Sequence, residues 1–321
     1  MTSTSGALPG ALLEAEVKGR SPWLDTWARL RQSKTAMAGL VIVVGMFVVA
    51  ILAPWIAPYP YDRQNLDIAQ QGPSLQHWLG TDSLGRDMLS RLIWGARSAA
   101  FVSTVPLLIS MAIGTFFGAV AGYFGGKIDT LIMRLTDVMF AFPGMLFAIL
   151  VAATIKPMVQ ESALRFGQLI GRPELGRSSA LDYVVVFIAL SLVSWGGMTR
   201  LMRGQILSLK ERDFVLAAEA MGASGWRVLF RHLLPNTLNI ILVVLSMGMA
   251  GMIMTESVLS FLGIGIQPPN ASWGAMVDEA LDSWRSHPQI FFIPGAVIAI
   301  MIYAFNFLGD GLYDALNPKG R

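Results

Sequence analysis

Uncharged stretches separated by charged segments set the pattern of this sequence. Six of them have 17 or more residues, and they run over 35–61, 98–126, 138–155, 183–199, 232–255 and 286–309. A helix needs about 20 predominantly apolar residues to cross the hydrocarbon core of a bilayer. The pattern therefore predicts six membrane helices, near 36–57, 99–122, 137–155, 182–206, 237–262 and 289–312. A seventh uncharged stretch, 257–277, is interrupted by glycines and prolines and is interpreted as a loop.

The composition supports a membrane protein. Hydrophobic residues make up 54% of the chain and charged residues 14%, whereas soluble domains average about 25% charged residues. The chain contains no cysteine, and its three histidines lie far apart in the sequence, which excludes disulfides, thiolate metal sites and a histidine-rich metal centre. The net charge of +3 comes with no run of basic residues, so nothing indicates binding to nucleic acid. The expected fold class is an all-α membrane protein.

The distribution of lysine and arginine predicts the orientation of the helices. If the N-terminus is cytoplasmic, the inner segments are 1–35, 123–136, 200–236 and 310–321, and they hold 15 of the 24 basic residues. Cytoplasmic segments carry the excess of Lys and Arg, so both termini are expected in the cytoplasm. The chain then divides into a cytoplasmic N-terminal segment (1–35), a first helix (36–57), an external loop (58–98), a five-helix core (99–312) and a cytoplasmic tail (313–321).

The external loop contains one segment with helical spacing. Asp82 is placed to cap a helix start, and Asp87 and Arg91 are spaced to pair across one turn. The apolar residues that follow the same spacing are Leu84, Met88 and Leu92. We expect an interfacial helix here, lying on the outer membrane surface. A metal site built from Asp82 and Asp87 is disfavoured because the alternating oxygen ligands of a calcium loop are absent.

Glycine, proline and arginine mark special positions near and within the predicted spans. The second helix contains a row of small residues, Gly114, Gly118 and Gly122, which lets another helix approach closely. Prolines inside helices are expected to kink them, and they occur here as Pro106, Pro143 and Pro294. At the end of the fourth helix, Arg200 and Arg203 are expected to reach the lipid headgroups.

The largest cytoplasmic segment, 207–236, is predicted to form two short helices. Asp213 is placed to cap the first helix, which stops at Gly222. The second runs over 225–233 and ends before Pro235. The first helix has a modest apolar face, formed by Leu216, Ala217, Ala220 and Met221. Two interpretations of that face stay open: it binds a partner, or it folds back against the membrane helices of its own chain.

Several sequence blocks, taken in order, resemble one known family. The order Ala217-Ala218, then Gly222, then His232-x-Leu234-Pro235 resembles the signature loop of the permeases of ATP-binding-cassette (ABC) importers. The other blocks are similar to the C-type permease of dipeptide, oligopeptide and nickel importers, and they are 80–87, 126–137, 260–269 and 307–318. Together the blocks extend from about 35 to 318, nearly the whole chain.

The resemblance implies the six-helix architecture of type I ABC importer permeases, in a bacterial or archaeal cytoplasmic membrane. The chain would form half of a translocation pathway for di- and oligopeptides and contact membrane lipid. The implied partners are a homologous second permease, two ATPases that bind ATP and magnesium, and an external solute-binding protein. The chain itself is then expected to be no enzyme and to hold no cofactor, and its sequence contains no Gly-x-x-x-x-Gly-Lys-Ser/Thr phosphate-binding motif. Nickel, glutathione or oligosaccharides are the alternative substrates.

In that family the short cytoplasmic helix fits a groove of the ATPase. The resemblance therefore assigns ATPase coupling to this segment, through Asp213, Leu216, Ala217, Ala218, Met221, Gly222, Leu234 and Pro235. One position departs from the family pattern, because Leu216 stands where a glutamate usually precedes the two alanines. Asp213, one turn earlier, is the candidate substitute for that charge, while Glu219 lies on another side of the helix. We expect docking through shape and apolar contact more than through this charge.

Glu256 and Met252 in the fifth helix are the candidates for a translocation gate. Acidic residues inside a membrane are functional candidates, although Glu256 lies close enough to the outer end of its helix to reach the interface instead. Met252 belongs to a group of flexible methionines, for which ordinary helix packing is the alternative to lining a pathway. A proton-coupled secondary transporter is the alternative of a different class. It requires internal repeats and acids near the bilayer midplane, whereas the two halves of this sequence show no repeat and its acids lie at predicted helix ends.

Overall fold

The computed structural model describes residues 22–316, and within that range the chain consists of helices and connecting turns without a strand. The helices are α1 (Pro22–Leu30), α2 (Lys34–Ile56), α3 (Met88–Phe124), α4 (Gly126–Ala141), α5 (Gly144–Leu169), α6 (Ala180–Lys210), α7 (Asp213–Ala220), α8 (Gly225–Arg227), α9 (Leu238–Phe261), α10 (Trp273–Glu279) and α11 (Pro288–Leu316). A π-helical turn, Val228–Leu233, follows α8, and 3₁₀ turns occupy Leu66–Ile68, Pro173–Arg177 and Leu234–Thr237. The predicted segments 1–35 and 313–321 lie partly outside the described residues.

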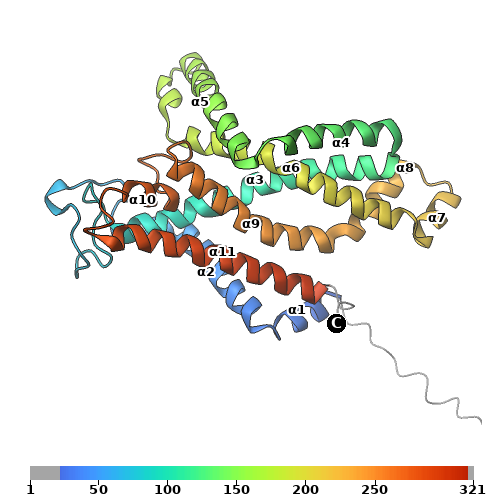
Figure 1. The fold of residues 1–321 in the computed structure, drawn as a ribbon, viewed down its shortest axis with the longest axis horizontal. Coiled ribbons are helices and arrows are strands. Elements are labelled where there is room, and N and C mark those ends of the chain that lie inside the picture. Colours follow the sequence, from blue (N-terminus) through green and yellow to red (C-terminus); the bar gives the residue numbers. More distant parts are fainter. Residues whose placement is uncertain (1–21, 317–321) are drawn as a thin grey trace, which may run out of the picture.

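Six of the described helices are long and apolar enough to cross a membrane, which confirms the all-α fold with six candidate spans. They are α2, α3, α5, α6, α9 together with the turns before it from Gly225, and α11. In Figure 1, α3 runs through the middle of the molecule, and α10 with the 58–87 loop lies at one end. The short helices α7 and α8 lie at the opposite end, so the long helices separate two groups of connecting segments.

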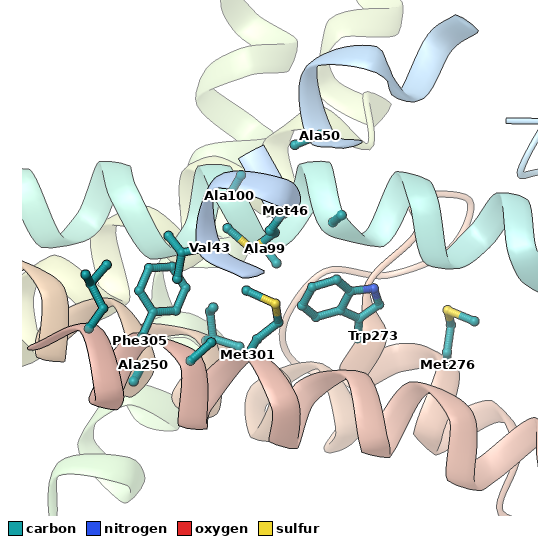
Figure 2. Packing of buried hydrophobic residues seen from close by; sticks show 14 of the residues in the cluster. Val43, Met46, Ala50, Ala99, Ala100, Ala250, Trp273, Met276, Met301 and Phe305 are labelled. Carbon is teal, nitrogen blue, oxygen red and sulfur yellow. The ribbon is translucent and has the colours of Figure 1, made fainter. Parts of the chain in front are cut away.

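One apolar core joins α2, α3, α9, α10 and α11. Figure 2 shows Met46 of α2 between the helices, near Ala99 and Ala100 of α3, with Phe305 of α11 and Trp273 of α10 directed into the same space. In lipid, helices associate through close packing and hydrogen bonds rather than through removal of apolar surface from water. Alanines opposite large side chains therefore allow α2 to approach both α3 and α11 closely.

The row of small residues in α3 packs against α6. A Cβ atom added to Gly118 would lie 2.4 Å from the carbonyl oxygen of Thr199 in α6. At Gly114 and Gly122 the added atom would lie 2.7 and 2.9 Å from other carbonyl oxygens of α6. A side chain at any of the three positions would collide with the α6 backbone. The predicted close helix approach is confirmed, and the structure identifies α6 as the partner helix.

The start of α3 differs from the sequence prediction. The helix begins at Met88 rather than near 99, and Asp87 caps it by accepting hydrogen bonds from the Ser90 N–H (2.8 Å) and hydroxyl (2.7 Å). The separate interfacial helix predicted in the external loop is therefore wrong, because its last turn is the first turn of α3. Asp82 does not cap that helix. It accepts hydrogen bonds from two backbone N–H groups in the turn that precedes α3.

A network of four charges, three of them fully buried, fixes the end of the molecule that carries α10. Asp82 Oδ2 accepts hydrogen bonds from Arg86 Nε (2.7 Å) and Arg91 Nη1 (2.6 Å). Glu279 of α10 accepts from the same two arginines, at 2.5 Å each. Buried charges persist only when they are paired, so this network ties the loop before α3 to α10. The predicted pair between Asp87 and Arg91 is wrong, because Arg91 pairs with Asp82 and Glu279 instead.

Two helices replace the single third span that was predicted over 137–155. α4 ends at Ala141 and α5 begins at Gly144, because the residue before a proline is disfavoured in helical conformation and Phe142 precedes Pro143. α5 also continues well past Lys156, the charge at which the predicted helix ended. Lys156 is tolerated because its Nζ lies 2.9 Å from Oδ1 of Asp182 in α6.

Ion pairs attach α4 to α6. Arg203 of α6 donates two hydrogen bonds to the carboxylate of Asp129 in α4, at 2.5 and 2.6 Å. Arg200 donates to Asp137 at 2.6 Å, and its guanidinium lies 4.0 Å from the ring centre of Phe140. The two arginines thus bind carboxylates of α4, where the sequence pattern indicated lipid headgroups as their surroundings.

Candidate functional site

The segment 211–237 connects α6 to α9 and forms a folded unit of α7, α8 and the two turns before α9. α7 ends as predicted, with Gly222 at a positive φ of +81° directly after its last turn. The N-terminal prediction is wrong in detail: Arg212 is the N-cap residue, and α7 has no side-chain cap hydrogen bond. Asp213 lies in the first turn, where a negative charge favours the helix dipole.

One face of the 211–237 segment is packed on the ends of α3 and α6. The buried side chains on this face are Val215, Ala218, Val228, Leu229 and Leu233, and they share an apolar cluster with Ala119, Tyr123 and Ile206. Gly225 allows this contact, since an added Cβ would lie 2.9 Å from the Tyr123 ring. The segment is therefore packed together with the ends of α3 and α6 as one unit.

Polar contacts at Tyr123 reinforce this packing. The Tyr123 hydroxyl donates a hydrogen bond to Glu219 Oε1 of α7 (3.0 Å). Lys210 donates from Nζ to the Tyr123 carbonyl (2.7 Å), and its ammonium lies 5.1 Å from the ring centre. Glu219 thus faces α3, away from Leu216, and serves contacts within the chain.

The opposite face of the segment is apolar and exposed. Leu216 is 54% exposed and Met221 is 83% exposed. Phe214, which the sequence reasoning missed, is exposed as well. Trp226 and Phe230 were also missed and are about half exposed, but they lie beside α3: the Trp226 ring is 5.0 Å from that of Phe124, and Phe230 lines a cavity with Phe116. Trp226 and Phe230 are four residues apart, one helical turn, and their rings stack at 5.8 Å; this spacing was the available signal. One face of the segment packs on its own chain. Binding of a partner by the other, exposed apolar face stays a prediction.

The predicted coupling residues divide between these two faces. The exposed ones are Asp213, Leu216, Ala217, Met221, Gly222 and Pro235. Ala218 is 3% exposed and Leu234 is partly buried, and both belong to or pack against the apolar cluster beneath the segment. The small size of Ala218 therefore serves packing on α3 and α6.

The two gate candidates are both buried within this subunit. Glu256 Oε1 accepts hydrogen bonds from the hydroxyls of Ser260 (2.6 Å) and Ser272 (2.8 Å), which ties α9 to the start of α10. Met252 packs in an apolar cluster with Leu107 and Leu190. The gate remains a prediction, and these contacts place Glu256 in a hydrogen-bonded link between helices. Within residues 22–316, no group of three or more His, Cys, Asp or Glu side chains is arranged to hold a metal ion.

Comparison with known proteins places these features in context. The family described as "Binding-protein-dependent transport system inner membrane component" matches residues 114–321. The family described as "N-terminal TM domain of oligopeptide transport permease C" matches residues 21–73. The first match begins at Gly114 in α3 and includes the later candidate spans. The second match includes α2.

Three similar proteins cover most of the chain. The dipeptide transport system permease protein DppC of Bacillus subtilis (strain 168) is 41% identical over 298 residues, which are 92% of this chain and 86% of that protein. The oligopeptide transport system permease protein OppC of the same organism is 35% identical over 321 residues, which are 100% and 97% of the two chains. The glutathione transport system permease protein GsiD of Shigella dysenteriae serotype 1 is 41% identical over 304 residues, which are 94% and 91%.

Proposed function

This chain belongs to the family of binding-protein-dependent transport system inner membrane components, and on that premise we propose that it is the peptide-conducting permease subunit of an ABC importer in a bacterial inner membrane. Membership of this family makes the chain a membrane component of a transport system, distinct from the ATPase. The six candidate spans agree with a multi-pass membrane protein. The observation that carries the proposal is that one face of the 211–237 segment packs on α3 and α6 while its opposite face is apolar and exposed.

The exposed face is proposed as the docking surface for an ATPase. Leu216 and Met221 would present apolar side chains to the partner, and Phe214 is exposed on the same short helix as Leu216. Val215 and Leu229 on the opposite face contact the ends of α3 and α6. ATP-driven movement of the docked ATPase would thus act on these two helices. ATP and magnesium belong to that partner, and the complex would contain two ATPases and a homologous second permease.

The proposed orientation follows from charge. Placing the 211–237 segment and both chain termini in the cytoplasm puts most of the lysine and arginine on the inner side. The end that carries α10 and the charge network of Asp82, Arg86, Arg91 and Glu279 then faces outward. An external solute-binding protein would deliver its cargo at that end.

Di- and oligopeptides are the proposed substrates. Two of the similar proteins are named for dipeptides and oligopeptides, at 41% and 35% identity. A glutathione transporter at 41% identity supports glutathione as the second candidate. All three names describe small molecules with peptide bonds and free carboxylates. We therefore favour this chemical class over nickel or oligosaccharides.

Substitution at Gly222 tests the docking proposal. An added Cβ at Gly222 would meet no atom within 4 Å, so a larger side chain there points away from the subunit. Gly222→Trp is expected to obstruct the ATPase and weaken its association by about 2 kcal/mol or more, roughly thirtyfold, with a matching loss of uptake. Gly222→Ala is the matched control, because both variants carry the same positive φ but only tryptophan adds bulk.

The assay compares both variants in the assembled importer, through ATPase co-purification and peptide uptake into vesicles. Insertion of the permease into the membrane is expected to be unchanged in both. A Gly222→Trp complex that binds its ATPases and transports as well as Gly222→Ala would show that the exposed face is not the docking surface.

A further inference from the structure

An aromatic cavity lies near the outer ends of α3 and α6. It encloses about 370 Å³, and its walls include the rings of Tyr61, Trp94, Phe101, Tyr183 and Phe187. Arg97 of α3 is the one charged residue among the residues that line it. The remaining polar groups are a few hydroxyls and one amide, including Ser98 and Asn270. Ligand sites commonly have this composition, with apolar walls and a small number of placed polar groups.

Arg97 differs from the two arginines that precede it, Arg86 and Arg91. Arg86 and Arg91 each bind two carboxylates. Among the described residues, Arg97 forms no ion pair, and its guanidinium lies instead 5.4 Å from the Trp94 ring centre and 6.0 Å from that of Phe101. A partly buried cation held over aromatic faces, without an anion, is poised to bind one.

A second cavity meets the first at Arg97. It encloses about 420 Å³ between α2 and α3, and it shares Arg97 and Phe101 with the aromatic cavity. Thr104, one of its lining residues, has a buried hydroxyl without a hydrogen-bond partner. Arg97 therefore lies between two cavities.

The charge around Arg97 is not neutralised nearby. Tyr61 is the titratable residue of the loop that lines the cavity, and burial, with a smaller contribution from Asp62, raises its pKa while Arg97 opposes the rise. Tyr61 therefore stays uncharged at neutral pH. Arg97 is also the last charged residue before the uncharged stretch 98–126, so it lies at the boundary of the membrane span. In the proposed orientation this boundary lies on the outer side of the membrane, where the solute enters the permease.

We propose that the cavity around Arg97 binds the carboxylate of the transported solute, such as the C-terminal carboxylate of a peptide, as it enters the permease from outside. Guanidinium binds carboxylate through two parallel hydrogen bonds, and the aromatic walls accept apolar side chains of the solute. This inference rests on the proposed function and adds a specificity-determining residue to it. A phosphate of a lipid headgroup offers similar anionic chemistry, and the test below separates the two sources.

The test uses the complete importer in lipid vesicles, with saturating binding protein. Vesicles receive an equimolar pool of tripeptides as free acids or the same pool as C-terminal amides, and mass spectrometry quantifies the accumulated peptides. Arg97→Gln is expected to lower the acid-to-amide uptake ratio about tenfold relative to wild type, the value of one charge-assisted contact. Arg97→Lys keeps the charge and is expected to retain most of the ratio.

Arg285→Gln is the matched control. Arg285 is exposed, its guanidinium lies 5.4 Å from the Trp284 ring centre, and it lines neither cavity. Its replacement is expected to leave the acid-to-amide ratio unchanged. Because the same binding protein is present throughout, its own selectivity cancels when each variant is compared with wild type.

Three results would overturn the proposal, and they are distinguishable. If wild type accumulates peptides and Arg97→Gln keeps the wild-type ratio, the carboxylate site is refuted while the transport function stands. If Arg97→Gln reduces both pools equally, the carboxylate site is refuted, and a reduction confined to vesicles with anionic lipid rather than pure phosphatidylcholine assigns Arg97 to an anionic lipid headgroup. If the wild-type importer accumulates neither pool, the proposed peptide transport fails as well.

Discussion

Replacing Gly118 with alanine should destabilise the crossing of α3 and α6. The added Cβ would lie 2.4 Å from the Thr199 carbonyl oxygen and 2.7 Å from the Met202 Cβ, about 1 Å short of the 3.4 Å at which ordinary contact begins. The nearest atom belongs to the backbone and has no alternative rotamer, so the two helices must separate. Overpacking of this kind costs about 1 to 3 kcal/mol.

Gly197→Ala supplies the matched control on the facing helix. Gly197 lies in α6, is exposed, and has no atom within 4 Å of an added Cβ. There the substitution only reduces the freedom of the unfolded chain and is expected to stabilise the helix by about 0.5 to 1 kcal/mol. The two glycine-to-alanine changes should therefore have opposite signs and differ by at least about 1.5 kcal/mol.

The assay is equilibrium unfolding of each purified variant in mixed micelles, with sodium dodecyl sulfate as denaturant and circular dichroism as the signal. The free energy of unfolding of Gly118→Ala should fall below that of wild type, and that of Gly197→Ala should not. If both variants shift in the same direction by similar amounts, the close approach of α3 and α6 at Gly118 does not limit stability, and the reasoning is refuted.

Three further predictions follow from polar contacts and topology. Asp82→Asn leaves two buried arginines facing one carboxylate and should destabilise the chain by about 3 to 5 kcal/mol, measured in the same unfolding assay; an unchanged midpoint contradicts the charge network. A cysteine at Ala220 should react with an impermeant maleimide only from the cytoplasmic side. Labelling in intact cells would contradict the proposed orientation. Arg203→Gln should break the ion pair that holds α4 and speed proteolysis of α4. Combining it with Asp129→Asn should raise the proteolysis rate little further, because the pair is already broken.

The sequence was sufficient for features that depend on local pattern. Uncharged stretches predicted the six candidate spans because a bilayer excludes unpaired charge along the whole length of a helix. The spacing of Gly114, Gly118 and Gly122 predicted a close helix contact because residues four apart share one face. Gly222 predicted the end of α7, since its positive φ suits a residue without a side chain.

The sequence was insufficient where a residue far away in the chain neutralises a charge that lies inside a helix. Charge was used to mark the start of α3, yet the helix extends back past Arg97 to Met88 and contains Arg91, whose charge is paired with Asp82 and the distant Glu279. Lys156 extends α5 for the same reason, through Asp182. Helix α10 was missed because it is short, and its position depends on Trp273 packing into a core built from four other helices.

The candidate docking surface was predicted in place but not in detail. The apolar face of Leu216, Ala217, Ala220 and Met221 was recognised and is exposed. Phe214 and Val215 were not recognised, and the sequence does not show that Val215 and Ala218 lie on α3 and α6. Trp226 and Phe230 were missed although they are four residues apart, and the packing of Trp226 beside Phe124 of α3 is a tertiary contact that the local sequence does not show.

Cross-linking from single cysteines tests the central proposal most directly, because the native chain contains no cysteine. A short thiol-to-amine cross-linker would be applied to the assembled importer carrying Met221→Cys, Leu216→Cys or Ala218→Cys. The first two positions are exposed and should link the permease to its ATPase, whereas Ala218 is buried against α3 and α6 and should not. Absence of a link from both exposed positions, or an equal yield from Ala218→Cys, would contradict docking of the ATPase on this face.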